Sequence, residues 1–198
     1  MRFKRIVQTI TYMPHFISLV VICGLIHIFT QSNGVLTQLA NFITGTEHAS
    51  LLGYAGLFRP IYTFSGIWQN IGWDSIIYLS AMSSIDPGLY EAAEIDGAGR
   101  FKKMWHVTLP QIRPTIIILF IFAVGGLMAS GHEKFILLYN PLTYESADVI
   151  ATYVYRRGLQ EASYSFATAV GLFSSVINFL LLWLTNKISK KYSEISIF

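Results

Sequence analysis

Long stretches without a charged side chain set the strongest constraint on how this chain can fold. The clearest spans residues 114–131, and within it residues 115–122 read Thr-Ile-Ile-Ile-Leu-Phe-Ile-Phe. About 20 apolar residues in a helix can cross the ~30 Å hydrocarbon core of a bilayer. Charged residues make up only 13% of the chain, against about 25% in a typical soluble domain, so polar side chains are too few to cover a core of this size. The sequence therefore predicts an all-α membrane protein.

Four segments are long and apolar enough to be predicted as transmembrane helices. They cover approximately residues 12–29, 64–85, 114–131 and 164–184. The second is the least hydrophobic, because its first half carries indole, amide and carboxylate groups. We therefore expect a multi-span helical bundle in which residues 1–198 form a single transmembrane domain.

The basic residues predict how this bundle is oriented. Of the 14 Lys and Arg residues, ten precede the first segment, separate the second from the third, or follow the fourth, and the other four lie in the two remaining connections. Cytoplasmic connections retain positive charge, so both termini and residues 86–113 are predicted to face the cytoplasm. Residues 31–63 and 132–163 are then external. The small net charge of +3 gives no support to a protein that binds nucleic acid.

The predicted cytoplasmic connection contains the most informative local pattern, at residues 86–110. Asp86 is a natural N-cap and Pro87 suits the first helical position, so a short helix is expected to follow them. Gly97 and Gly99 can then adopt the left-handed backbone that ends it. A second helix is predicted next, with apolar residues on one face: Phe101, Met104, Trp105 and Leu109. The segment is thus expected to form a helix–turn–helix.

Small residues gather around the turn of this segment. Ala92, Ala93, Gly97 and Ala98 would allow close backbone approach to a partner, while Glu91 and Asp96 supply polar groups. Physical reasoning supports two interpretations about equally. The hairpin either enters a groove on a partner protein or lies as an amphipathic element on the bilayer surface.

The same residues carry a resemblance to a known family. Glu91-Ala92-Ala93, Asp96-Gly97-Ala98 and Leu109-Pro110 together resemble the EAA motif of the inner-membrane permeases of ABC importers. Residues 8–18, 76–80 and 164–173 are similar to LplB-like permeases for polysaccharide-derived oligosaccharides. The resemblance implies the fold of a type I ABC importer permease, a multi-pass position in a bacterial plasma membrane, and docking of residues 86–110 on an ATPase subunit.

The resemblance also implies a set of partners. These are a second permease subunit, ATP-binding cassette ATPase subunits, an extracellular solute-binding lipoprotein, the lipid bilayer and a sugar or oligosaccharide. The chain has no GxxxxGK[ST] loop, so ATP and Mg²⁺ are expected on the ATPase and no cofactor is expected here.

Other functions remain as alternatives to the sugar permease. An intramembrane enzyme would need paired acids, an HExxH motif or a Ser/His pair within the spans, and none of these is recognised in the predicted spans. The chain is therefore predicted not to be an enzyme. A membrane scaffold or assembly subunit, or a permease of the same family for another solute, stays open. Family members have more spans than the four predicted here, so the chain is expected to lack their N-terminal spans, as a fragment or through a misassigned start.

Polar and aromatic groups inside the predicted spans are candidates for a substrate path. Trp68, Asn70, Trp73 and Asp74 lie in the external half of the second span. Indole faces can stack on sugars, amides can bond to them, and an ionisable group within a membrane suggests function. The competing interpretation places all four at the external interface, where Trp is common. Asn178 is a second candidate, although a hydrogen bond between helices would explain it equally.

Three other residues with reactive side chains are assigned no chemistry. His15 and His27 have no neighbours at metal-ligand spacing. Cys23, the single cysteine, lies in an apolar run and is expected to pack as a small apolar residue.

Overall fold

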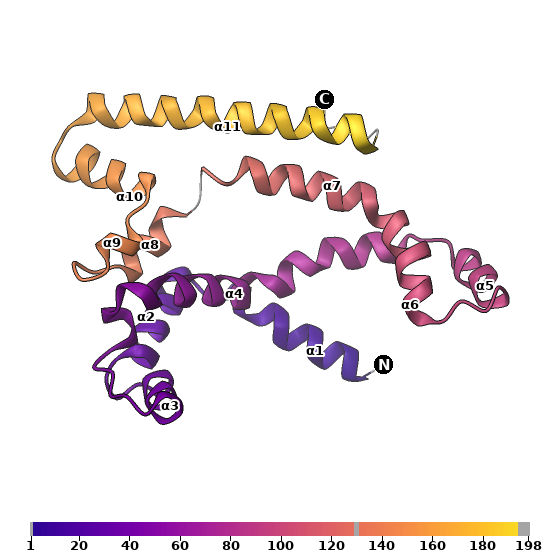
Figure 1. Cartoon of the computed structure of the whole chain (residues 1–198), viewed down its shortest axis with the longest axis horizontal. Coiled ribbons are helices and arrows are strands. Elements are labelled where there is room, and N and C mark those ends of the chain that lie inside the picture. The colour runs from indigo at the N-terminus through magenta and orange to yellow at the C-terminus, as the bar shows by residue number, and fades with distance from the viewer. Residues whose placement is uncertain (1, 129–130, 194–198) are drawn as a thin grey trace. The chain divides into compact units, whose positions relative to one another are not determined.

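The computed structural model describes residues 2–128 and 131–193, and every regular element within them is a helix (Figure 1). In chain order the α-helices are α1 (Arg2–Tyr12), α2 (Leu19–Thr30), α3 (Val35–Thr44), α4 (Ala55–Ser83), α5 (Pro87–Ile95), α6 (Arg100–Lys103), α7 (Leu109–Gly125), α8 (His132–Leu138), α9 (Tyr144–Ala147), α10 (Ile150–Tyr155) and α11 (Tyr164–Ser193). Short 3-10 turns occupy Met13–Phe16 and Leu51–Gly53, and π-helical segments occupy Met104–Thr108 and Arg156–Gln160. The prediction of an all-α protein is confirmed.

Within the described residues three stretches are long and apolar enough to cross a bilayer: Leu19–Thr44, Arg100–Gly125 and Tyr164–Lys191. The structure differs from the four-span prediction at residues 64–85. These belong to α4, whose 29 residues would reach across a bilayer at about 1.5 Å per residue. Its amide, carboxylate and hydroxyl groups, however, lower its hydropathy. Such a helix needs protein or water, rather than lipid, around its polar side chains.

The first apolar stretch is bent rather than being one helix. α2 and α3 are joined by a turn in which the Thr30 carbonyl accepts hydrogen bonds from Thr37 Oγ1 at 2.8 Å and Ser50 Oγ at 3.1 Å. A Cβ added at Gly34 would lie 2.2 Å from the carbonyl oxygen of Phe29. The bend therefore depends on a residue without a side chain at this point.

The second helix of segment 86–110 also differs from expectation. The sequence predicts this helix and the span at residues 114–131 as separate helices, but the helix is continuous over Arg100–Gly125, through Pro110 and Pro114. Pro110 lies in the first turn of α7, directly after the π-helical segment Met104–Thr108. Pro110 thus follows directly on a segment with altered hydrogen-bond spacing, whereas Pro114 lies inside α7. α7 ends at Gly125, and part of the predicted third span, residues 129–130, lies outside the described residues.

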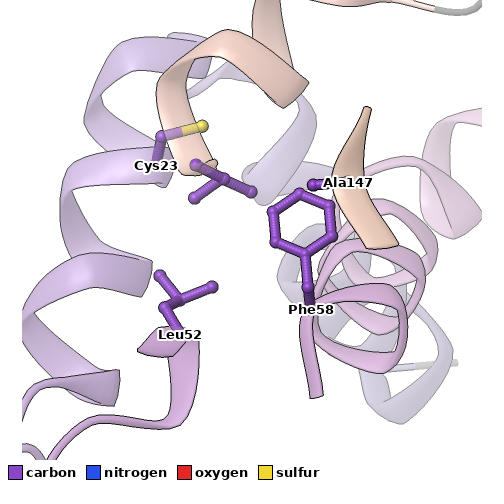
Figure 2. Close-up of a cluster of buried hydrophobic side chains, with 5 residues drawn as sticks. Cys23, Leu52, Phe58 and Ala147 are labelled. Atoms are coloured by element: carbon purple, nitrogen blue, oxygen red, sulfur yellow. The ribbon is translucent and has the colours of Figure 1, made fainter. Parts of the chain in front are cut away.

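The chain divides into two compact units, and α4 and α11 each contribute to both. One unit consists of Met1–Trp73 with Ala129–Leu172, and the other consists of Asp74–Met128 with Phe173–Phe198. In the first unit a small core forms where α2, α4, α8 and α9 meet. Its buried side chains are Cys23, Leu52, Phe58, Leu138 and Ala147. Figure 2 shows Cys23 and Leu52 facing Phe58 and Ala147. Cys23 is thus a packing residue, as expected.

Most apolar side chains outside this core are exposed. No residue in the apolar window of α11 is buried, and Leu172, Phe173 and Phe179 are each more than 60% exposed. A soluble protein rarely leaves such a continuous apolar surface uncovered. Lipid or the helices of other subunits must therefore solvate it.

Candidate functional site

The turn of segment 86–110 is built by local backbone geometry. Asp86 Oδ1 accepts the Gly88 N–H at 2.9 Å and so caps α5. At the other end Ala98 N–H donates to the Ala93 carbonyl at 2.9 Å, and Gly97, with φ +73°, donates to that of Glu94 at 3.0 Å. This pair of bonds is a Schellman motif, which needs a left-handed residue at the position of Gly97.

Gly99 does not share this role, contrary to the sequence prediction. Its backbone is extended, with φ −69° and ψ 171°, and it is the N-cap of α6. Any residue can adopt these angles, so the left-handed turn depends on Gly97 alone.

Two side-chain contacts join α5 to the helix that follows. Tyr90 Oη lies 2.9 Å from Thr108 Oγ1, at the end of the π-helical segment. Lys103 Nζ lies 3.1 Å from Glu94 Oε2, but the Glu94 side chain is 74% exposed, so this ion pair contributes at most about 1 kcal/mol. α5 is therefore held against the continuous helix Arg100–Gly125 mainly by the hydroxyl contact and the turn.

The residues that carry the EAA resemblance are all accessible. Glu91, Ala92, Asp96, Gly97, Leu109 and Pro110 are exposed, and Ala93 and Ala98 are half-buried. A shallow depression of about 410 Å³ lies beside them, with basic groups from Lys102, Lys103 and His106 and an acid from Asp96 in its lining. None of these residues is used in a core of this chain, so they are available to a partner.

One large apolar residue beside the turn was not selected by sequence reasoning: Ile95, which is 87% exposed. Phe101, predicted on the apolar face of the second helix, is 79% exposed. Exposed large apolar side chains are expected at the centre of a protein interface. The sequence shows an apolar residue just before the Schellman turn, but it does not show whether that side chain is buried in this chain or exposed to a partner.

The structure brings together two of the proposed substrate-path residues, through His15. The His15 ring stacks on Trp73 with ring centroids 4.5 Å apart and 5° between the planes, and His15 Nδ1 lies 3.2 Å from Asn70 Oδ1. Phe16 meets Trp73 edge-on at 5.6 Å. One face of Trp73 is therefore covered within the chain. Sequence reasoning missed His15 because 55 residues separate it from Asn70.

The other candidates lie apart from this cluster. Trp68 lines an apolar groove of about 400 Å³ together with residues of α2 such as Ile22 and Phe29. Asp74 is exposed and belongs to the second unit. Asn178 Oδ1 is buried without a hydrogen-bond partner in the described part of the chain, so this oxygen does not make the alternative hydrogen bond between helices there. A role in a substrate path stays a prediction for all five residues.

Comparison with known proteins identifies the family. The pattern of the family described as "Binding-protein-dependent transport system inner membrane component" matches residues 1–194. The chain belongs to this family. It is an integral membrane protein, and its homologues bear the names of transport components rather than of enzymes.

Two curated relatives from Bacillus subtilis (strain 168) are similar to this family member over almost its whole length. It is 42% identical to protein LplB, over 99% of this chain and 62% of LplB. It is 41% identical to YteP, the polygalacturonan/rhamnogalacturonan transport system permease protein, over 99% of this chain and 61% of YteP. The chain thus spans about three fifths of these relatives' length.

Two solved structures share the permease fold with this chain. One is a bacterial ABC transporter involved in the import of the acidic polysaccharide alginate, with a TM-score of 0.91 and 44% identity over 96% of this chain and 67% of that chain. The other is a bacterial alginate ABC transporter in complex with a periplasmic protein bound to an alginate pentasaccharide, with a TM-score of 0.93 and 43% identity over 98% and 68%. The prediction of an ABC importer permease fold is confirmed.

Proposed function

We propose that this chain is a permease subunit of an ATP-driven importer for an oligosaccharide. The observation that carries the proposal is the exposed turn of segment 86–110, present in a chain whose family consists of membrane components of binding-protein-dependent transport systems. The names of the relatives, which include permeases for polygalacturonan and rhamnogalacturonan and for arabinooligosaccharides, support an oligosaccharide as the substrate.

The geometry of the segment suits a mechanical link to an ATPase. Ile95 and Phe101 offer apolar contacts, while Glu91 and Asp96 offer charged ones. In this proposal an ATPase subunit receives α5 in a groove, and ATP binding and hydrolysis on that subunit move α5. The helix Arg100–Gly125 continues without a break from beside the turn into an apolar stretch. A displacement of α5 would thus pass into the membrane as a rigid movement of this helix.

The remaining partners follow from the same proposal. A second permease subunit would cover the exposed apolar surface of α11, and an extracellular solute-binding lipoprotein would deliver the sugar. ATP and Mg²⁺ would be bound by the ATPase subunits, while this chain would line the path of the sugar across the membrane.

A reconstituted importer tests this function. Proteoliposomes that contain this chain, its companion permease and the ATPase subunits are expected to accumulate an oligosaccharide only when ATP and the solute-binding protein are present. Vesicles assembled with all subunits except this chain are the control and should not accumulate it. Equal uptake without this chain would show that it is a scaffold or assembly subunit rather than part of the path.

The orientation of the chain can be tested by thiol labelling. Glu47, Glu145 and Lys102 are all exposed, so the reactivity of a cysteine at each site reports the side of the membrane. In a Cys23→Ala background, Glu47→Cys and Glu145→Cys are expected to react with a membrane-impermeant maleimide added outside intact cells, whereas Lys102→Cys should react only after permeabilisation. The opposite pattern would place segment 86–110 outside, where no ATPase could reach it.

A further inference from the structure

The first unit contains a cleft that is both aromatic and polar, and no residue of segment 86–110 lines it. Its volume is about 290 Å³, close to the lower end of the roughly 300–1,000 Å³ typical of ligand sites. Arg59, Tyr62 and Thr63 of α4 line one side, and Phe135, Ser146 and Asp148 line the other. All of them fall in the segments predicted from the basic residues to be external.

One wall of the cleft is a stack of aromatic rings. Tyr62 and Phe135 lie with ring centroids 4.1 Å apart and 19° between the planes, and Phe58 stacks beside Phe135 at 6.1 Å. Such a wall excludes water and offers an apolar surface of the kind on which the C–H face of a sugar ring packs. A cleft of this size and composition suits one unit of an oligosaccharide.

Arg59 is the cation at the mouth of the cleft. Its Nε donates a hydrogen bond to the Ser146 carbonyl at 3.2 Å, which holds the guanidinium in place. No ion pair among the described residues involves Arg59, and its two terminal nitrogens have no hydrogen-bond partner there. The planar fork of a guanidinium binds a carboxylate through two parallel hydrogen bonds.

Lys134 is a second cation, placed behind the aromatic wall. Its side chain is only 7% exposed, its Nζ donates to the Tyr62 carbonyl at 3.2 Å, and it lies 4.9 Å from the centre of the Tyr62 ring. Burial lowers the pKa of this ammonium group, and no acidic side chain of the described chain pairs with it. A buried ammonium without a counter-ion is costly and strengthens the local affinity for an anion.

The acid in the cleft does not cancel these charges. Asp148 is held by Arg156 at 2.6 Å and by the Thr152 hydroxyl at 2.7 Å. Although burial acts to raise the pKa of Asp148, these hydrogen bonds outweigh it and the pKa lies below its usual value. Arg59 and Asp148 are the charged residues that line the cleft, and because Arg156 neutralises Asp148, the Arg59 guanidinium is left without an acidic partner among the described residues. The other acids of the same external segment that are close in sequence, Glu133 and Glu145, are exposed and do not line the cleft.

We propose that this cleft binds a uronic acid unit of an acidic oligosaccharide, with Arg59 contacting the carboxylate and Lys134 adding its positive field through the Tyr62 ring. The inference rests on the proposed function and names the substrate class of the importer. The aromatic wall packs against the sugar ring. Arg59 and Lys134, which have no acidic partner among the described residues, favour a charged uronate unit over a neutral sugar unit.

A matched pair of ligands isolates the carboxylate. The purified importer complex, without its solute-binding protein, is titrated by calorimetry with trigalacturonate and with the trimethyl ester of the same trisaccharide. The acid is expected to bind at least about tenfold more tightly than the ester, since each hydrogen bond between charged groups is a strong one. This advantage should shrink as ionic strength rises, because salt screens the exposed Arg59.

Substitutions assign the preference to this cleft. Arg59→Gln should remove the preference for the acid and leave the weaker affinity for the ester unchanged, while Arg59→Lys should keep part of it. Lys134→Met removes the buried charge at similar volume and should reduce the preference to a smaller extent. Arg157→Gln is the control, because Arg157 pairs with Glu161 and does not line the cleft.

Three results would overturn the inference: no binding of trigalacturonate to the wild-type complex, equal affinity for acid and ester, or an unchanged preference in Arg59→Gln. A failure of the proposed function looks different, because the complete importer with its solute-binding protein would then show no ATP-driven uptake of any oligosaccharide, neutral or acidic. Uptake of neutral sugars without a preference for acid would leave the permease function standing and remove only the acidic substrate class.

Discussion

The substitution Gly97→Val is expected to yield a correctly inserted permease that binds its ATPase poorly or no longer couples ATP hydrolysis to transport. Gly97 has φ +73° and supplies one of the two hydrogen bonds that end α5. Placing a residue with a Cβ in the left-handed backbone conformation costs about 1–2 kcal/mol, which is equivalent to roughly a 5- to 30-fold change in the affinity for the ATPase. An added Cβ has no neighbour within 4 Å in this chain, so backbone strain and contact with the partner must produce the effect.

Two matched variants distinguish strain from a general loss of glycine. Gly97→Asn should retain most coupling, because Asn tolerates the left-handed region better than other residues with a Cβ. Gly99→Ala should behave like the wild type, since Gly99 has an extended backbone and open space around it. Glu91→Lys should act in the same direction as Gly97→Val by reversing a charge on the docking surface. Copurification of the ATPase and substrate-stimulated ATP hydrolysis are the measurements, and normal values for Gly97→Val would contradict the docking proposal.

The substitution Gly72→Ala is expected to cause a large loss of stability. The added Cβ would lie 2.0 Å from the carbonyl oxygen of Thr11 and 2.4 Å from its carbonyl carbon. Both are backbone atoms, so the end of α1 must move away from α4 as a whole. Overpacking of this kind typically costs about 1–3 kcal/mol, and the same shift would pull His15 away from Trp73. The melting temperature of the purified complex should fall by several degrees, as expected from about 1 kcal/mol or more.

A second glycine of the same helix provides the control. Gly56 has nothing within 4 Å of an added Cβ, so Gly56→Ala should leave the melting temperature unchanged or raise it through the better helix propensity of Ala. If Gly72→Ala melts at the wild-type temperature, the close approach of Thr11 to α4 does not exist in the folded protein.

Rules for helix ends and for apolar stretches predicted much of the secondary structure of this protein. An N-cap, a proline in the first turn and a glycine after the last turn determine where a short helix begins and ends, and α5 has these features at Asp86, Pro87 and Gly97. Residues 115–122 could only be a lipid-compatible helix. These features depend on residues within a few positions of one another, so they can be predicted from the sequence.

The boundaries of the spans were less predictable. The bend at Gly34 brings this residue close to the Phe29 carbonyl, and the helix Arg100–Gly125 continues through a π-helical segment and two prolines. Both are features of the backbone geometry, which hydropathy does not report. The apolar composition of the region was visible, whereas the local geometry was not.

The sequence by itself determined that this chain is a helical membrane protein, and it contained the residues whose pattern resembles the EAA motif. Only the tertiary structure decided that His15 covers Trp73, that Thr11 meets Gly72, and that the Arg59 guanidinium reaches the Ser146 carbonyl, 87 residues away in the chain. Helical propensity and hydropathy act over a few neighbouring residues, but a cleft depends on which surfaces of distant helices pack together. That choice is made by side-chain packing across the whole unit, and no local pattern records it.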